Sequence, residues 1–191
     1  SREKFLTLEN SKDVLGYTTK FREDPIYLDP RHKDLGARLI TNLEKLHLSL
    51  KLLELKSSNL DEYYSVSNKL GIPQINTDKL QNNLFGIECN LNELNGIDFK
   101  KGCYVGQENT ARIKLKDKLS KRLFPVEVIE GDLSKDNIIH HENTELGRVL
   151  INNKFPFAII KFKDKNFKFE KIFKCGSASV KIKKPYWFKF D

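Results

Sequence analysis

The sequence predicts an α+β protein in two parts, the second of which is a small antiparallel β-barrel. Helical spacing of apolar residues, with clear start and stop signals, occurs before residue 118. After that point, short alternating segments recur between turn residues, which is typical of a barrel or sandwich. With 39% hydrophobic and 10% aromatic residues, the 191-residue chain has an ordinary globular composition. We therefore expect one domain over residues 1–118 and a second over residues 119–191.

Short strands are expected at the start of the chain, over Phe5–Leu8, Val14–Thr19 and Pro25–Leu28, because polar turn residues separate these stretches. A further strand runs into Ile40. The leucines that follow are spaced as in an amphipathic helix, but their pattern is too short for a coiled coil. The chain contains no methionine and starts directly in this pattern. We therefore expect that an N-terminal segment is missing.

A second predicted helix has well-defined ends. Asn59 can cap its N-terminus, and Glu62, three residues on, can complete a capping box. Gly71 is a helix stop, and Pro73 prevents continuation. The helix is therefore expected to lie between Asn59 and Gly71.

The second domain is predicted to be built from strands separated by Gly, Asp and Asn turns. Its last strands alternate lysine with phenylalanine, which favours one buried and one solvated face. His140-His141-Glu142 is expected to be an exposed loop rather than a metal site, because neighbouring side chains rarely converge on one ion. The predicted strands are Phe124–Ile129, Gly147–Ile151, Phe157–Phe162, Phe167–Phe173 and Ser179–Lys183.

The net charge of +8, from 34 basic and 26 acidic residues, has several interpretations. It is compatible with nucleic acid, a membrane surface or an anionic small ligand, and equally with a lysine-rich surface that has no single partner. Lysines are densest between Lys161 and Lys189. An aromatic platform for RNA would look similar to this Lys/Phe pattern, but no RNP-like motif accompanies it.

Cysteine usage and hydropathy indicate the compartment. No apolar run approaches the ~20 residues that cross a bilayer, and nothing at the start resembles a signal peptide. Cys89, Cys103 and Cys175 are odd in number and form no C-x-x-C pair. This favours a reducing interior over a disulfide framework, so we expect a soluble, intracellular protein.

The run Lys101-Gly102-Cys103-Tyr104-Val105-Gly106-Gln107-Glu108 is the most informative motif in the chain. Its glycines allow a tight turn and a close approach by a ligand, and Lys100 and Lys101 favour the reactive thiolate. Alternatively, Cys103 is a small buried hydrophobe, or a peptidase-type nucleophile with a histidine as base. No peptidase signature accompanies it. The candidate bases for that alternative are His32, His47, His140 and His141.

This run resembles the signature K-G-C-Y-x-G-Q-E of the YgfZ-type folate-binding proteins, relatives of the aminomethyltransferase (T-protein) of glycine cleavage. The resemblance extends from about Asp29 to Arg112. It includes a D-P-R…L-G-x-R segment, a Y-x-x-x-R-x-x-x-G-I-P element and an L-N-G-I-D-F lead into the motif. The chain departs from the pattern at Ser67, where relatives usually have arginine, and at Gly86, which replaces a proline.

The resemblance implies an N-terminally truncated aminomethyltransferase-like folate-binding domain followed by the β-barrel. It implies tetrahydrofolate, or a one-carbon derivative, as cofactor and a role in iron–sulfur cluster assembly or repair. Expected partners are reduced folate and iron–sulfur proteins or assembly factors. The resemblance also implies effects on tRNA modification through enzymes that contain iron–sulfur clusters. The location would be the bacterial cytoplasm or, in a eukaryote, the mitochondrial matrix. The alternatives are an aminomethyltransferase of glycine cleavage, whose members generally lack the cysteine motif, and a basic RNA-associated domain.

The resemblance also assigns site residues. Cys103 would be the functional thiol, held by the motif residues Lys101, Gly102, Tyr104, Gly106, Gln107 and Glu108. Glu88 would accept hydrogen bonds from the pteridine, as the corresponding glutamate does in aminomethyltransferase-like proteins; its sequence context alone would make it a surface residue. Arg112 is four residues after Glu108. It would either pair with Glu108 on a helix surface or, with Gln107 and Glu108, fix the cysteine loop or reach the folate.

Overall fold

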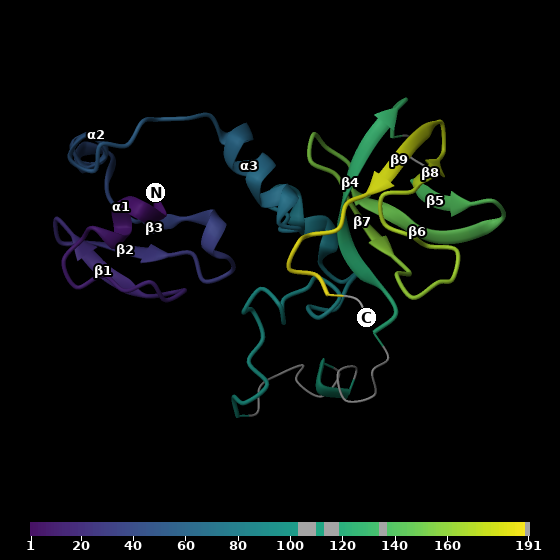
Figure 1. The fold of residues 1–191 in the computed structure, drawn as a ribbon, viewed down its shortest axis with the longest axis horizontal. Coiled ribbons are helices and arrows are strands. Elements are labelled where there is room, and N and C mark those ends of the chain that lie inside the picture. Colours follow the sequence, from purple (N-terminus) through teal and green to yellow (C-terminus); the bar gives the residue numbers. More distant parts are fainter. Residues whose placement is uncertain (103–109, 113–118, 134–136, 190–191) are drawn as a thin grey trace. The chain divides into compact units, whose positions relative to one another are not determined.

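A computed structural model describes residues 1–102, 110–112, 119–133 and 137–189 (Figure 1). It divides into two compact units, Ser1–Val66 and Ser67–Asp191. These units are defined by contacts within the chain, and the domain boundary at residues 118 and 119 stays a prediction.

The first unit contains a three-stranded antiparallel sheet in the order β1-β2-β3 (Figure 1). Its small apolar core gathers Phe5, Ile26, Leu28 and Leu53. The elements are α1 (Arg2–Leu6), β1 (Thr18–Phe21), β2 (Asp24–Leu28), the 3-10 helix η1 (Lys33–Leu35), β3 (Ala37–Leu39) and α2 (Leu43–Leu52), followed by α3 (Leu60–Lys69).

Two of the predicted strands in this unit are wrong or displaced. Residues 2–6 form helix α1 instead of a strand, and the Phe5 side chain at its end is fully buried while Leu6 is exposed. The strand expected from Val14 starts only at Thr18, because Gly16 adopts a left-handed φ of 77° inside a turn. The strand predicted over Pro25–Leu28 is confirmed as β2, and the strand predicted to run into Ile40 is confirmed as β3.

The expected ends of α3 are largely confirmed. The Asn59 side-chain oxygen accepts a hydrogen bond from the Glu62 backbone N–H at 2.9 Å, as a capping residue does. The Glu62 carboxylate accepts a hydrogen bond from the Ser58 hydroxyl. At the other end, Gly71 has a φ of 71°, which is the left-handed conformation of a helix stop.

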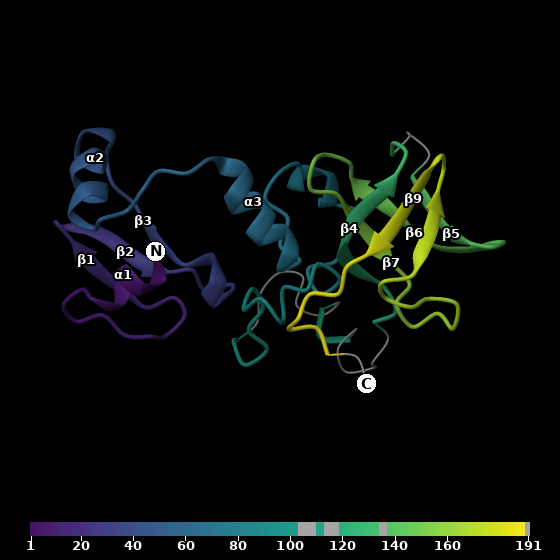
Figure 2. The ribbon, with the colours of Figure 1, turned by 45° about the horizontal axis from the view of Figure 1, so that its top comes forward.

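The second unit contains a closed antiparallel barrel in the order β4-β7-β6-β5-β8-β9, which the pairing of β4 with β9 completes (Figure 2). This confirms the predicted C-terminal β-barrel. Register shifts in β4, β5 and β6 mark bulges, which help a sheet to curve and close. A short 3-10 helix, η2 (Thr77–Leu80), precedes the barrel. The strands are β4 (Arg122–Glu130), β5 (Ile138–His141), β6 (Thr144–Ile151), β7 (Phe157–Ile160), β8 (Ile172–Cys175) and β9 (Ala178–Ile182).

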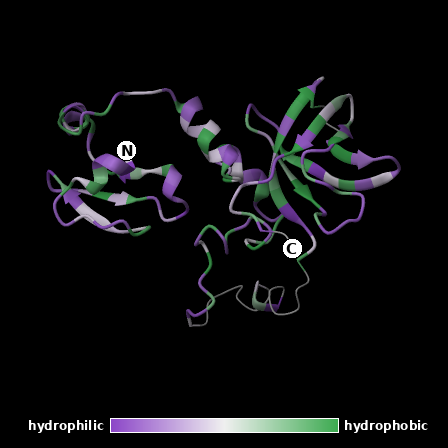
Figure 3. Ribbon diagram, in the orientation of Figure 1, coloured by the Kyte–Doolittle hydropathy of each residue, from purple (hydrophilic) through white to green (hydrophobic). Residues whose placement is uncertain are grey.

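Aromatic side chains fill the barrel core. Along the strands, hydrophobic stretches are interrupted by hydrophilic residues (Figure 3). The rings of Phe124 and Phe188 meet edge to face with centroids 5.0 Å apart, a favoured aromatic geometry. Phe162, Phe167 and Phe173 are buried in the same core. The phenylalanines that alternate with lysines therefore serve packing, and these buried rings offer no stacking surface to a nucleic acid base.

Two local predictions in the barrel are wrong. The strand expected over Phe167–Phe173 begins only at Ile172, because residues 169–170 form a turn in which Glu170 has a left-handed φ of 64°. The loop expected at His140-His141 is part of strand β5, which is held by the fully buried Ile139. None of the helices in the described part of the chain combines the length and apolarity needed to span a bilayer.

Candidate functional site

Glu88 lies in a single turn between α3 and the barrel. The backbone N–H groups of Glu88 and Cys89 both donate to the Phe85 carbonyl, at 2.9 and 3.2 Å. In return, Glu88 Oε2 accepts a hydrogen bond from the Phe85 N–H at 2.9 Å. This is the carboxylate half of a capping box. Glu88 therefore stabilises its own turn, and its Oε1 has no hydrogen-bond partner among the described residues.

A pocket of about 300 Å³ lies beside Glu88, against strands β6 and β7. Three cationic side chains, Lys121, Arg148 and Lys161, line it together with Glu88 and Glu145. Lys161 is 3.8 Å from the Glu145 carboxylate, whereas Lys121 and Arg148 have no ion-pair partner in the described part of the chain. Once Lys161 and Glu145 are paired, the pocket keeps the Glu88 carboxylate and the two cations Lys121 and Arg148, a setting that favours anionic and hydrogen-bonding ligands.

A buried polar pair fixes the Glu88 turn to the barrel. Asn90 is fully buried and donates from Nδ2 to the Leu123 carbonyl at 2.7 Å. Arg122 donates to Asn90 Oδ1 at 3.0 Å and forms an ion pair with Glu93 at 2.7 Å. The Leu123 N–H donates to the Glu88 carbonyl at 2.9 Å. Asn90 and Arg122 carry no signal in the sequence, because their partners lie 32 and 33 residues away.

The cysteine motif is only partly described. Cys103, Tyr104, Gly106, Gln107 and Glu108 lie outside the described residues. Ahead of the motif, the Lys100 N–H donates to Asp98 Oδ1 at 2.8 Å, which forms an Asx turn. Lys101 lines a second pocket of about 210 Å³ with Gly86, Gly96 and Thr110.

Arg112 belongs to the described residues but lines neither of these two pockets. The structure thus brings Glu88 together with Lys121, Arg148 and Lys161. It places Lys101 in a separate hollow.

The other two cysteines are unreactive by environment. Burial, followed by the negative charge of Glu88, raises the pKa of the Cys89 thiol to about 11. Cys175 is fully buried in the barrel core. Since the thiolate is the nucleophilic form, neither side chain is suited to chemistry at neutral pH.

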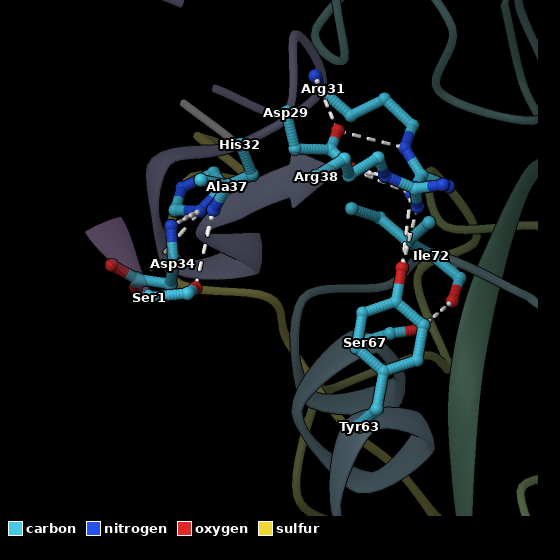
Figure 4. A network of polar contacts seen from close by, with 10 residues as sticks. All are labelled: Ser1, Asp29, Arg31, His32, Asp34, Ala37, Arg38, Tyr63, Ser67 and Ile72. Carbon is cyan, nitrogen blue, oxygen red and sulfur yellow. Dashed lines mark hydrogen bonds and ion pairs between the residues drawn. The ribbon is translucent and has the colours of Figure 1, made fainter. Parts of the chain in front are cut away.

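A second polar cluster joins the D-P-R…L-G-x-R segment to helix α3 (Figure 4). Asp29 is 1% exposed and accepts hydrogen bonds from Arg31 Nη2 at 2.8 Å and Arg38 Nε at 2.6 Å. Both guanidinium groups also donate to the Tyr63 hydroxyl, at 3.2 and 2.6 Å. Burial of Asp29 opposes its ionisation, but the bonds from the two arginines outweigh this and hold the pKa of the carboxyl below its usual value.

Ser67 occupies the position where the resembling proteins have arginine. Its side chain is buried, and its hydroxyl donates to the Ile72 carbonyl at 2.8 Å. The Ile72 N–H donates back to the Ser67 carbonyl at 2.9 Å. Ser67 therefore closes the C-terminal end of α3.

Within the described ranges, no three His, Cys, Asp or Glu side chains gather closely enough to hold a metal ion. The fold and these clusters define an α+β protein with a C-terminal β-barrel, in which a glutamate turn borders a basic pocket. No protein-family model matches the chain.

The chain is similar to mitochondrial proteins named iron–sulfur cluster assembly factor IBA57 or its homologue. It is 34% identical over 115 residues to the protein of Dictyostelium discoideum, covering 60% of this chain and 28% of that relative. Identity is 36% over 110 residues for Mus musculus, covering 58% and 30%, and 35% over 102 residues for Homo sapiens, covering 53% and 28%. The chain thus spans less than a third of the length of these curated relatives. The similarities confirm the resemblance to YgfZ-type proteins.

Proposed function

We propose that this chain acts in the assembly or repair of iron–sulfur clusters and binds reduced folate in that role. The observation that carries the proposal is its identity of 34–36% to the named assembly factors over more than half of its own length. On this proposal, the part before the barrel is an aminomethyltransferase-like folate-binding domain. The cluster, or its iron and sulfur, is the substrate.

The residues around Glu88 suit a reduced pteridine. Adjacent N–H groups on the heterocycle match a carboxylate, which offers about four lone-pair sites. The turn uses Glu88 Oε2 once, through the Phe85 N–H, and leaves acceptor capacity for a ligand. Lys121 and Arg148 line the same pocket without an ion-pair partner in the described part of the chain. Their charge would draw in the carboxylates of the folate tail.

Cys103 is the proposed functional thiol. Lys101 and Gly102, with Tyr104, Gly106, Gln107 and Glu108, would shape its loop, and Arg112 would support that loop or reach the folate. Of the other two thiols, Cys175 is disqualified by complete burial and Cys89 by a pKa raised to about 11. A thiol of this kind can hold iron or sulfur transiently, or form a redox-sensitive contact with a partner protein.

The cellular location that we propose is taken from the names of the relatives. Their names call them mitochondrial, so we place the chain in the mitochondrial matrix if its source is a eukaryote and in the cytoplasm if it is a bacterium. Effects on tRNA modification would arise through enzymes that contain clusters.

Calorimetric titration with 5-formyltetrahydrofolate, a stable reduced folate, tests the ligand. Glu88→Gln keeps an oxygen for the Phe85 N–H but replaces a charged acceptor with a donor. Binding should weaken by roughly 1–3 kcal/mol. Glu130→Gln, at the exposed end of β4, is the control and should bind like the parent. Equal affinity in the parent and in Glu88→Gln would remove Glu88 from the site.

A further inference from the structure

Strand β4 has no partner strand along one edge of its second half. It pairs with β7 only from Arg122 to Pro125 and with β9 only from Val126 to Glu130. The Val126 N–H donates to the Pro156 carbonyl at 2.9 Å, just before the start of β7. Beyond that bond, β4 runs on past the start of β7 (Figure 2). The closed barrel therefore keeps a short open edge on this side of β4.

The register of β4 on β9 shows which main-chain groups face the open edge. The Lys183 N–H donates to the Pro125 carbonyl at 3.0 Å, on the β9 side. Successive residues of an antiparallel strand direct their N–H and C=O groups to opposite edges. Glu127 therefore bonds toward β9, and Val128 faces away from it. Val128 makes no hydrogen bond on that open side to any residue that the structure describes, and its N–H and C=O are an unused donor and acceptor.

A pocket of about 520 Å³ lies along this edge. Val126 and Val128 line one side of it, and Asn153 and Lys154 of the β6–β7 connection line the other. The gap between them has a local cause. The Phe155 N–H donates to Asn153 Oδ1 at 2.7 Å, which is an Asx turn, and this turn keeps the connection from continuing β7 alongside β4. The pocket is thus a groove with a strand edge as its wall, and Val128 is 38% exposed there.

The charges around the groove are close to balance. Lys183 is paired with Glu170 at 2.9 Å and Glu127 at 3.5 Å, and Asp132 lines the groove with the remaining lysines. Charge therefore gives a ligand little to bind. The features left are the main-chain pair of Val128 and the apolar surface that Val126, Val128 and Pro156 share.

These features match a polypeptide main chain. We propose that the groove binds an extended, uncharged segment of a partner protein, which pairs with Val128 and adds a strand to β4. Residues paired across two strands have side chains on the same face, so alternate side chains of the segment would be apolar and lie beside Val126 and Val128. Because the β6–β7 connection walls the groove opposite β4, the occupant enters as a single strand and not as the edge of a second barrel. No step of the proposed folate function uses this groove.

Amide hydrogen exchange of the whole chain, followed by NMR, tests the open edge. In the chain alone, the Val128 amide should exchange at least about tenfold faster than the hydrogen-bonded amides of Val126 and Glu127. The uncharged peptide Ac-Thr-Val-Thr-Val-Thr-NH2 is the probe. It should shift the Val128 amide signal saturably and slow its exchange, with little dependence on salt because no ion pair forms. The same peptide with N-methylated valines lacks the N–H donors and should bind about tenfold more weakly.

Two proline variants separate the edge from the barrel. Val128→Pro removes an N–H that faces the groove, and proline is tolerated where a strand N–H is unpaired. This variant should stay folded and lose peptide binding. Glu127→Pro, one residue earlier, removes an N–H that bonds toward β9 and should lower the melting temperature strongly. If Val128→Pro also unfolds, the methylated peptide decides the question on the parent chain.

Three results would overturn the proposal. The first is a Val128 amide that is already protected in the chain alone, and the second is no saturable binding of the unmethylated peptide. The third is peptide binding that N-methylation of the valines leaves unchanged.

Discussion

Arg122 donates a hydrogen bond to the side-chain oxygen of Asn90 across 3.0 Å, and the same guanidinium lies over the rings of Phe188 and Phe162, 5.4 and 5.8 Å from their centroids. One arginine thus connects the Glu88 turn to the aromatic core of the barrel. The position of the candidate site is set by a buried polar contact as much as by the local turn.

Asn90→Ala should destabilise the protein by about 2–4 kcal/mol, because it removes two buried hydrogen bonds and places alanine at a left-handed φ of 62°. Urea unfolding measures this. Asn82→Ala is the matched control, since Asn82 has a nearly equal φ of 61° but is exposed. If both variants lose the same stability, the cost belongs to the backbone and not to the buried contacts.

Asp29→Asn should cost about 3 kcal/mol at pH 7, because it leaves two arginines without their shared carboxylate. The pKa of Asp29 is lowered by folding, so its contribution is present above the unfolded value of ~3.9 and disappears as pH falls through the lower folded value. Urea unfolding from pH 7 to pH 2 should show the difference between parent and variant shrinking below about pH 4. Asp78→Asn, on an exposed residue, should show no such convergence.

The thiols should be alkylated in a definite order. Cys103 should react with iodoacetamide with a midpoint below the ~8.5 of a free cysteine, because lysines precede it. Cys89 should react appreciably only as pH approaches its pKa of about 11, and Cys175 only on unfolding. Peptide mass spectrometry across pH 7 to 10 reads each site separately. Early modification of Cys89 would contradict the environment described for it.

Cys103→Ser should fold and bind reduced folate but fail to support iron–sulfur enzymes in a host that lacks the protein. Cys89→Ser should restore them like the parent. For the buried Cys175 the suitable control is Cys175→Ala, because a serine hydroxyl in an apolar core would lack a partner. Full restoration by Cys103→Ser would show the motif to be structural.

Much of the architecture could be predicted because it depends on local pattern. Short alternating segments between turn residues predicted the barrel, and Asn59 and Gly71 predicted the ends of α3. Strand β5 was missed because its two histidines suggested a loop, while the burial of Ile139 decides its conformation. Helix α1 was not predicted. Phe5 is its one buried residue, and a helix can bury a single ring without the alternating pattern of a strand.

The clusters could not be predicted, because they depend on tertiary contact. Asp29, Arg38 and Tyr63 meet across 9 to 34 residues of chain, and their segments taken alone indicate only a turn, a strand start and a helix face. Ser67 illustrates the same limit. The sequence shows only that Ser67 departs from the family pattern, whereas in the structure its hydroxyl closes the C-terminal end of α3.

The pairing of β4 with β9 has a consequence for how the chain matures. The first and last strands of the barrel are hydrogen-bonded neighbours, with Val126 opposite Ile182. Contacts between residues so distant in sequence require loop closure before they stabilise anything, which slows folding. During synthesis, β4 leaves the ribosome well before its partner and exposes an apolar strand with an unpaired edge. The barrel can therefore close only after Ile182 has emerged, and until then half of β4 lacks its final strand partner.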